Sequence, residues 1–353
     1  MDIFDVLISA SDLGASDVHI NYKCEPIARV NGKFIKISNE LLSKSDTEKM
    51  ANELIETQKL NEVKKLGEYD FSISIKNLYR FRVNIYKQQD SYAISARIIN
   101  SKIPDLEILG LPNVVREFVK KENGLVLVTG PTGSGKSTTL ASILDSINKD
   151  FQKHIITLED PIEYIYNRKN SIISQREIGK DTKNFKSGLR SVLRQDPDVI
   201  LIGEIRDEET LATALTAAET GHLVFSTLHT IGAAQTIDRI IDMFQANQQN
   251  QIRMQLSSVC EGIISQQLIP NINNEGMVVA TEVMVSTSAI KNLIRDSKTH
   301  QISNIIQTGS KNGMQLMDQD LVNLFKRRKI SKESVINRCI DLEYTKRLIG
   351  LEF

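Results

Sequence analysis

Residues 130–139 are Gly-Pro-Thr-Gly-Ser-Gly-Lys-Ser-Thr-Thr, and they follow the apolar run Leu-Val-Leu-Val at positions 125–128. Their pattern is G-x4-G-K-[ST], in which glycines let backbone N–H groups turn inward around an anion. A helix that starts at the end of such a turn adds partial positive charge from its N-terminus. The sequence therefore predicts a strand, a phosphate-binding loop (the P-loop) and a helix, in that order.

The P-loop pattern also predicts roles for individual side chains. Lys136 is expected to reach the terminal phosphates of a nucleoside triphosphate, and the Ser137 hydroxyl to ligate Mg²⁺. Switch GTPases and small-molecule kinases share this loop, so it does not by itself indicate hydrolysis. The guanine-binding pattern N-K-x-D is missing, because in Asn148-Lys149-Asp150 the acid comes one residue early. The predicted nucleotide-binding residues are Gly130, Pro131, Thr132, Gly133, Ser134, Gly135, Lys136, Ser137 and Thr138.

Length and composition are typical of a two-domain protein without a membrane span. The chain has 353 residues. A single hydrophobic core usually belongs to a shorter chain than this, so two domains are expected. Lysine plus arginine and aspartate plus glutamate number 44 each, so no global field favours nucleic acid or an anionic membrane. Cys24, Cys260 and Cys339 lack the spacing of a zinc site or a disulfide framework. With no signal peptide and no apolar run near ~20 residues, we expect a cytoplasmic protein with reduced thiols.

Residues 1–100 are predicted to form a small α+β domain. Apolar and polar residues alternate in short runs from position 18 to position 99, which is typical of strands with one buried face. Asn31-Gly32 lies between two such runs and predicts a tight hairpin turn. Helical patterns occur at about 3–13 and 47–65.

The pattern changes after residues 101–112, which have a proline near each end and are expected to connect two domains. Over residues 113–285, apolar strands alternate with amphipathic helical patterns, as in a parallel sheet covered on both faces. Residues 286–353 show short amphipathic helices instead. The predicted fold class is therefore α/β, with an α+β N-terminal domain, a P-loop core and C-terminal helices.

Two acidic groups follow predicted strands of the second domain. Glu204 comes just past the apolar run 199–202, where a carboxylate can face Mg²⁺ and its waters as a Walker B acid does. The stretch Leu-Glu-Asp-Pro-Ile-Glu-Tyr includes Glu163, and a carboxylate at this edge of a sheet can orient an attacking water. A structural alternative is that Asp160 caps a helix with Pro161 in its first position. The two interpretations are compatible.

His222 and His229 bracket another predicted strand, in Thr-Gly-His-Leu-Val-Phe-Ser-Thr-Leu-His-Thr. An isolated histidine is more often structural than catalytic. However, Ser226, Thr227 and Thr230 gather with His229 at the strand end that would face the phosphates. A phosphate-sensing role and a structural role therefore stand on equal terms.

Three arginines of the N-terminal domain are candidates for contact with a nucleotide. Arg80 and Arg82 lie on the polar face of the strand pattern at 79–86, and Arg97 follows in the next strand. A solvated polar face is the structural alternative. Arginine stabilises the charge on a transferring phosphoryl group, by roughly 10³- to 10⁵-fold in rate for arginine fingers, so these side chains are candidates if this domain packs over a nucleotide.

Four stretches in order resemble the Walker A, Asp box, Walker B and His box of the type II/IV secretion ATPases: GPTGSGKST, TLEDPIEY, RQDPDVILIGEIRD and TGHLVFSTLHT. GASDVHI and VNIYKQQ also resemble the N-terminal domain of that family. The resemblance implies a PAS-like N-terminal domain, a RecA-like ATPase core, ATP and Mg²⁺ as cofactors, and a homohexameric ring with ATP between subunits.

The same resemblance implies roles for the site residues. Glu163 matches the proposed catalytic base, and Glu204 matches the Walker B acid, which with Ser137 would hold Mg²⁺. The arginines fall in the region that supplies arginine to the nucleotide, without singling one out. The catalytic residues implied in this way are Lys136, Glu163, Glu204, His222, His229, Arg80, Arg82 and Arg97.

Residues 289–296, Ala-Ile-Lys-Asn-Leu-Ile-Arg-Asp, resemble the AIRNLIRE signature of ATPases that retract type IV pili. Lys291 and Asp296 replace an arginine and a glutamate, which keeps each charge. Without the family, the stretch is an amphipathic helix that buries Ile290, Leu293 and Ile294. The resemblance implies that the ring acts on an inner-membrane pilus platform protein and meets the membrane only through that partner, at its cytoplasmic face.

Three other functions stay open on the sequence. A pilus-extension or type II secretion ATPase is disfavoured by the short N-terminal region and by AIKNLIRD. A RecA-like nucleic-acid translocase is disfavoured by the balanced charge, and no direct contact with nucleic acid is expected. A nucleotide-dependent scaffold would bind MgATP without turning it over.

Overall fold

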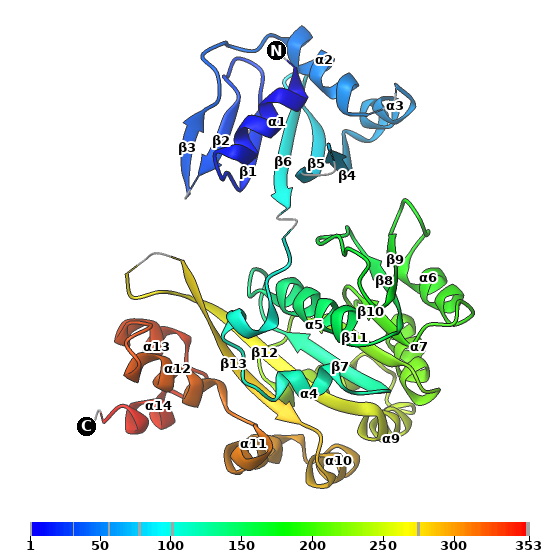
Figure 1. Cartoon of the computed structure of the whole chain (residues 1–353), viewed down its shortest axis with the longest axis vertical. Helices are drawn as coiled ribbons and strands as arrows, with labels where there is room; N and C mark the ends of the chain where they lie inside the picture. The colour runs from blue at the N-terminus through cyan, green and yellow to red at the C-terminus, as the bar shows by residue number, and fades with distance from the viewer. Residues whose placement is uncertain are drawn as a thin grey trace. The chain divides into compact units, whose positions relative to one another are not determined.

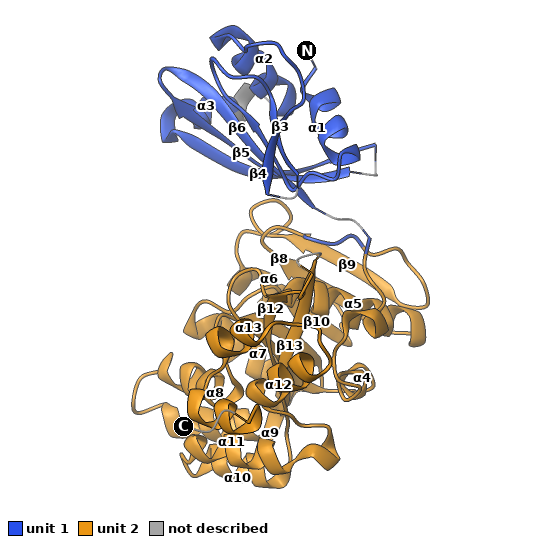
Figure 2. Ribbon diagram, turned by 90° about the vertical axis from the view of Figure 1, so that its left-hand side faces the viewer, with its two compact units in different colours: residues 1–102, 163–165 blue, residues 103–162, 166–353 orange. Residues whose placement is uncertain are grey.

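The computed structural model describes residues 2–30, 32–55, 57–76, 79–99, 102–273 and 276–350. The chain divides into two compact units (Figure 2): Met1–Lys102 with Glu163–Ile165, and Ile103–Ile162 with Tyr166–Phe353. Within these described ranges, no helix has both the length and the apolar character needed to cross a membrane.

The first unit is one antiparallel sheet with helices packed on it. Its strand order is β3-β2-β1-β6-β5-β4 (Figure 1). The strands are β1 (Asp17–Ile20), β2 (Ile27–Val30), β3 (Lys33–Lys36), β4 (Glu68–Ile75), β5 (Tyr79–Gln88) and β6 (Ser91–Ile99). The helices are α1 (Ile3–Asp12), α2 (Lys44–Leu54) and α3 (Thr57–Leu66).

The alternation predicted for β5 is confirmed, because Phe81, Val83 and Ile85 are fully buried in the core under the helices. Val30 pairs with Lys33 across the predicted hairpin; Asn31 of that turn lies outside the described residues. The helical pattern predicted at about 47–65 is confirmed, but it forms two helices with a break between them. Ile55 is extended, with φ −136° and ψ 152°, and buries its side chain, so that α2 ends before it and α3 begins separately.

The second unit is built on one larger sheet, with strand order β13-β12-β7-β11-β10-β8-β9 (Figure 1). All neighbours are parallel except β13, which pairs antiparallel with β12 at the edge. The predicted strands are confirmed as β7 (Gly124–Thr129), β8 (His154–Glu159), β10 (Val199–Ile202) and β11 (Leu223–Leu228). The sheet is completed by β9 (Ile172–Glu177), β12 (Cys260–Pro270) and β13 (Met277–Val285).

Helices cover both faces of this sheet. Leu125 and Leu127 of β7 belong to the main core with α6 (Phe185–Val192), α7 (Glu208–Glu219), α8 (Ala233–Asp242) and α9 (Gln249–Val259). On the opposite face, Phe118 of α4 (Val115–Val119) lies over Gly262 of β12. The helix after the P-loop, α5 (Lys136–Asp150), contacts β7, α4 and the short 3-10 helix η1 (Leu106–Leu109). Its predicted apolar stripe is buried: Leu140, Ile143, Leu144 and Ile147.

The predicted C-terminal helices are confirmed. They are α10 (Ser288–Arg295), α11 (Ile302–Thr308), α12 (Met317–Lys326), α13 (Lys332–Arg338) and α14 (Leu342–Leu348). In α10, which carries AIKNLIRD, Ile290 and Ile294 are fully buried in the main core. Helices α12 and α13 form a second, smaller apolar cluster against β12 and β13.

Gly262 gives a test of this packing, because a Cβ there would lie 2.2 Å from Phe118 Cζ and 3.0 Å from Met284 O. We expect Gly262→Ala to lower the free energy of unfolding by about 1–3 kcal/mol, the usual cost of overpacking, as measured by urea denaturation. Adding Phe118→Leu should recover part of this loss, because the two sites are in contact. An unchanged unfolding midpoint in Gly262→Ala would contradict the packing.

Candidate active site

The P-loop has the backbone geometry that its sequence predicts. It joins β7 to α5, and Gly130, Gly133 and Gly135 have φ of 140°, 78° and 86°. A Cβ on Gly130 would lie 2.3 Å from the backbone oxygen of Gln266 and 2.6 Å from Ser134 Oγ. Glycine is therefore required at position 130 for two reasons, its positive φ and the close approach of the neighbouring strand.

The loop and the start of α5 present groups suited to a phosphate. The N-cap residue of α5 is Gly135, which has no side chain to cap the helix, and a helix N-terminus of this kind is suited to bind an anion. The Ser134 hydroxyl is buried and has no hydrogen-bond partner among the described residues. Lys136 is buried, and its Nζ donates to the backbone oxygens of Gly130 at 2.8 Å and Pro131 at 3.0 Å. Its ammonium group therefore lies beside the loop, and its contact with the terminal phosphates stays a prediction.

The sheet brings the other predicted site residues to the same edge as the P-loop. Leu228 at the end of β11 pairs with Thr129 at the end of β7, and Ile202 of β10 pairs with Ser226 of β11. Because parallel strands share one carboxyl edge, the residues that follow these strands gather there. Glu204 and His229 therefore lie on the P-loop side of the sheet.

Glu204 and His229 are in direct contact. His229 Nε2 lies 3.4 Å from Glu204 Oε2, and the Arg206 guanidinium contacts the other carboxylate oxygen. The Glu204 side chain is 17% exposed, compared with 54% for His229. The structure thus brings together two of the predicted catalytic residues, and it adds Arg206, which the sequence analysis did not single out.

The hydroxyls of Ser226 and Thr227 hold the strand that carries Glu204. Ser226 Oγ donates to the backbone oxygen of Ile202 at 2.8 Å, and Thr227 Oγ1 donates to that of Gly203 at 2.7 Å. Both side chains are buried. These bonds fix the backbone directly before Glu204, so both hydroxyls have a structural use in this state.

His222 lies at the opposite edge of the sheet. It precedes the six residues of β11, which places it about 20 Å from the carboxyl edge at 3.3 Å per residue. Its Nδ1 lies 2.9 Å from the backbone oxygen of Ala217 and 3.2 Å from Thr220 Oγ1. The structure does not bring His222 to the P-loop of its own chain.

The loop that carries His229 is anchored by two buried side chains that carry no motif. Ser265 Oγ accepts from Gly232 N at 2.9 Å, and Glu282 Oε1 accepts from Ala233 N at 2.8 Å. Ser265 and Glu282 face each other across β12 and β13. Burial raises the pKa of the Glu282 carboxyl, against the opposing effect of the N–H groups of Ala233 and Met317. Sequence reasoning missed this anchor.

Glu163 lies on an irregular segment between β8 and β9, so the structural alternative, in which Asp160 caps a helix, is wrong. Two backbone N–H groups of this segment bind side chains of β9. Ile162 N donates to Glu177 Oε2 at 3.2 Å, and Tyr166 N donates to Gln175 Oε1 at 3.1 Å. Ile162 and Tyr166 are buried, whereas Glu163 between them is exposed.

The three candidate arginines lie on strands of the first unit. Arg82 faces Arg97 across β5 and β6. Arg97 Nε donates to Asp17 Oδ1 at 3.0 Å, and Arg80 donates to Ser72 and Ser74. The pKa of Asp17 is lowered, because hydrogen bonds from Ser16 and Arg97 outweigh its burial. Within this unit the arginines therefore form part of the polar face of the sheet.

Mg²⁺ usually binds one or two carboxylates together with phosphate oxygens and waters, rather than an all-protein cage. In the described part of the chain, no three His, Cys, Asp or Glu side chains are arranged to hold a metal ion. Ser137 in the first turn of α5 and Glu204 just past β10 nevertheless fit an ion shared with a nucleotide. Together with the P-loop, they provide the donor types that MgATP requires.

Comparisons with known proteins find relatives over most of the chain. The family model described as type II/IV secretion system protein matches residues 2–337. The chain is 44% identical over 334 residues to the type IV pilus retraction ATPase PilT of Pseudomonas aeruginosa, covering 95% of this chain and 97% of that protein. It is 42% identical over 320 residues to a twitching motility protein of Neisseria gonorrhoeae, covering 91% of this chain and 86% of that protein.

A solved structure is similar over nearly the whole chain. The crystal structure of the pilus retraction motor PilT with bound ADP superposes with a TM-score of 0.93, at 44% identity, covering 98% of this chain and 99% of that one. The predicted fold class, an α+β N-terminal domain followed by an α/β P-loop core with C-terminal helices, is thereby confirmed. The chain belongs to the type II/IV secretion system protein family.

Proposed function

We propose that this chain is a motor ATPase that hydrolyses ATP to drive retraction of a type IV pilus. The observation that carries the proposal is the similarity to PilT across 95% of this chain and 97% of that protein, together with a P-loop, Glu204 and His229 at one sheet edge. The similarity therefore includes α10 with AIKNLIRD and is not confined to the nucleotide-binding core.

The chemistry follows from the positions of the side chains. Lys136 and the N-terminus of α5 bind and neutralise the terminal phosphates, and Ser137 and Glu204 hold Mg²⁺, which supplies charge stabilisation when it is bound. Glu163 orients and deprotonates the attacking water. His229 holds the Glu204 carboxylate at the edge where the γ-phosphate lies, and one of the arginines stabilises the transferring phosphoryl group.

The proposed assembly is a homohexamer with ATP between subunits, which would allow an arginine of one chain to complete the site of the next. The ring would act at the cytoplasmic face of the inner membrane on a pilus platform protein. No direct nucleic-acid contact is proposed. His222, remote from the P-loop of its own chain, would act through the neighbouring subunit or serve a structural role.

The first prediction separates nucleotide binding from hydrolysis. We expect Lys136→Ala to lose ATP binding, and Glu204→Gln and Glu163→Gln to bind ATP normally with at least about 100-fold lower kcat, because each removes a group that acts on the reacting water or ion. ATP binding is measured by fluorescence titration and turnover by phosphate release. The matched control is Glu208→Gln, an exposed acid in the first turn of α7. Wild-type turnover in both glutamate variants would reject the assignment.

A second prediction concerns what ATP hydrolysis moves, which we propose is a type IV pilus. Cells that carry Glu204→Gln as their sole copy should accumulate abundant pili that never shorten, because extension would continue without retraction. Pilus number is counted by electron microscopy, and pilus length is followed in live cells. Cells without pili would identify an extension ATPase instead, and unchanged pili would indicate that the ATPase drives secretion or another process. Stimulation of hydrolysis by single-stranded DNA would favour a translocase.

A further inference from the structure

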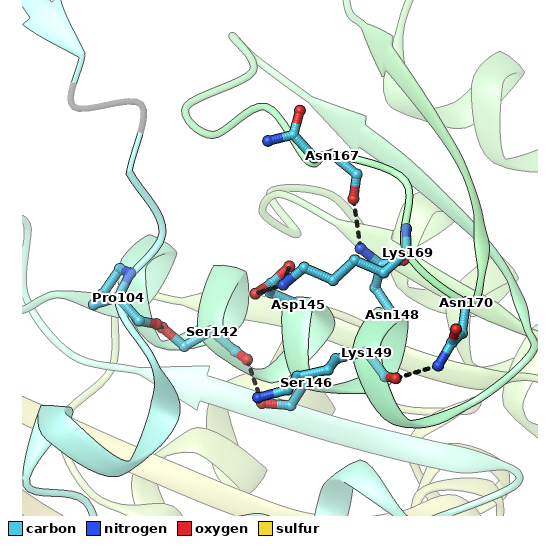
Figure 3. A network of polar contacts seen from close by, with 9 residues as sticks. All are labelled: Pro104, Ser142, Asp145, Ser146, Asn148, Lys149, Asn167, Lys169 and Asn170. Atoms are coloured by element: carbon cyan, nitrogen blue, oxygen red, sulfur yellow. Dashed lines mark hydrogen bonds and ion pairs between the residues drawn. The ribbon is translucent and has the colours of Figure 1, made fainter.

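Asn148 belongs to the sequence that narrowly misses the guanine-binding pattern, and the structure gives it a different use. It lies in the last turn of α5, the helix that begins at Lys136 of the P-loop. Its residue is fully buried. Figure 3 shows its side chain turned toward the segment that contains Asn167, Lys169 and Asn170.

Asn148 makes three hydrogen bonds to the backbone of that segment. Its Nδ2 donates to the backbone oxygen of Asn167 at 2.8 Å, and its Oδ1 accepts from Lys169 N at 3.1 Å. Its own backbone oxygen accepts from Asn170 N at 2.9 Å. The amide uses a donor and an acceptor at once, which a carboxylate or a hydroxyl of similar size cannot do in the same geometry.

Two more contacts fasten the same segment to α5. The Asn170 side chain donates to the backbone oxygen of Lys149, and Lys169 Nζ pairs with Asp145 at 2.7 Å (Figure 3). The backbone oxygens of Asn148 and Lys149 belong to the helix end, whose carbonyls have no partner within the helix. Residues 167–170 therefore supply the partners that this helix end lacks.

Residues 167–170 lie at the C-terminal end of the irregular segment that carries Glu163. From the other side, Glu177 and Gln175 of β9 hold Ile162 and Tyr166. The segment thus has anchors on β9 and a separate anchor on α5. The α5 anchor connects it directly to the helix that starts at the P-loop.

We propose that Asn148 is a positioning residue for Glu163: it fixes the segment that carries this carboxylate to the P-loop helix. The inference rests on the proposed function, in which Glu163 acts on the water that attacks the γ-phosphate. Catalysis depends on holding such groups within a fraction of an ångström of the reacting atoms. A loosened segment would leave ATP bound by the P-loop and misplace the base.

The alternative is that Asn148 only completes the end of α5. A purely structural role predicts lower stability with unchanged kcat per folded molecule. A positioning role predicts a lower kcat with an unchanged KM for ATP, because the phosphates are held by residues at the other end of the helix. The split between kcat and KM therefore separates the two roles.

The test compares Asn148→Asp with wild type and with Ser146→Ala in the full chain. The aspartate keeps the acceptor and removes the donor, whereas Ser146 Oγ donates within α5, to Ser142 O. We expect Asn148→Asp to lower kcat by about 10- to 100-fold with the KM for ATP unchanged. Hydrogen exchange in residues 160–170, followed by mass spectrometry, should become faster. Ser146→Ala should match wild type in both measurements.

Asn170→Ala removes the exposed bond to Lys149 and keeps the test usable if Asn148→Asp does not fold. It should shift kcat and exchange in the same directions by smaller factors. Faster exchange with unchanged kcat, or no change in either, would overturn the positioning role. Glu163→Gln separates two failures. If Glu163→Gln turns over ATP like wild type, Glu163 is not the base and this proposal fails with that assignment. If Glu163→Gln loses turnover but Asn148→Asp keeps a normal kcat, only the positioning role of Asn148 is rejected.

Discussion

The register of the larger sheet is the constraint on which the site depends. One row of paired residues runs from Leu228 through Thr129 and Ser265 to Glu282, across β11, β7, β12 and β13. The P-loop starts after Thr129, the His229 loop follows Leu228, and the other two side chains anchor that loop. A slip of one residue in any of these pairings would turn the anchors to the wrong face. The buried apolar strands resist such a slip, and they therefore also fix the positions of the P-loop and of the His229 loop.

Helix α5 connects the P-loop to parts of the chain that lie away from the sheet edge. Its first turn follows the P-loop, and its last turn holds the segment that leads from Glu163 to β9. Between them, Ser142 Oγ donates to the backbone oxygen of Pro104 at 2.7 Å, in the stretch that leads from the first unit (Figure 3). One rigid element thus contacts the phosphate loop, the segment of the proposed base and the connection between units. A change at the phosphates that shifted this helix would therefore also shift the segment of the proposed base and the connection between units.

Much of this arrangement could be predicted from the sequence, because its signals are local. The P-loop pattern, the apolar runs that became strands and the stripe of α5 each lie within a few consecutive residues. Two of the features that were missed rest on partners remote in the chain: Glu282 lies 49 residues from Ala233, and Asn148 lies 21 from Lys169. The alternative of a helix capped by Asp160 fails for the same reason, since Glu177 and Gln175 bind backbone N–H groups of that segment. His222 and His229 bracket one strand, as the sequence predicted, and only the family resemblance had given His222 a place in the site.

A crystal structure of the chain with Mg²⁺ and a non-hydrolysable ATP analogue tests the account most directly. We expect the terminal phosphates at the N-terminus of α5, with Lys136 Nζ moved from the Gly130 and Pro131 oxygens to the γ-phosphate. Mg²⁺ should lie against Ser137 Oγ, with the Glu204 carboxylate facing its waters. Phosphates bound elsewhere, or a Glu204 carboxylate turned away from the ion toward Arg206, would contradict the proposal that this sheet edge is the hydrolytic site.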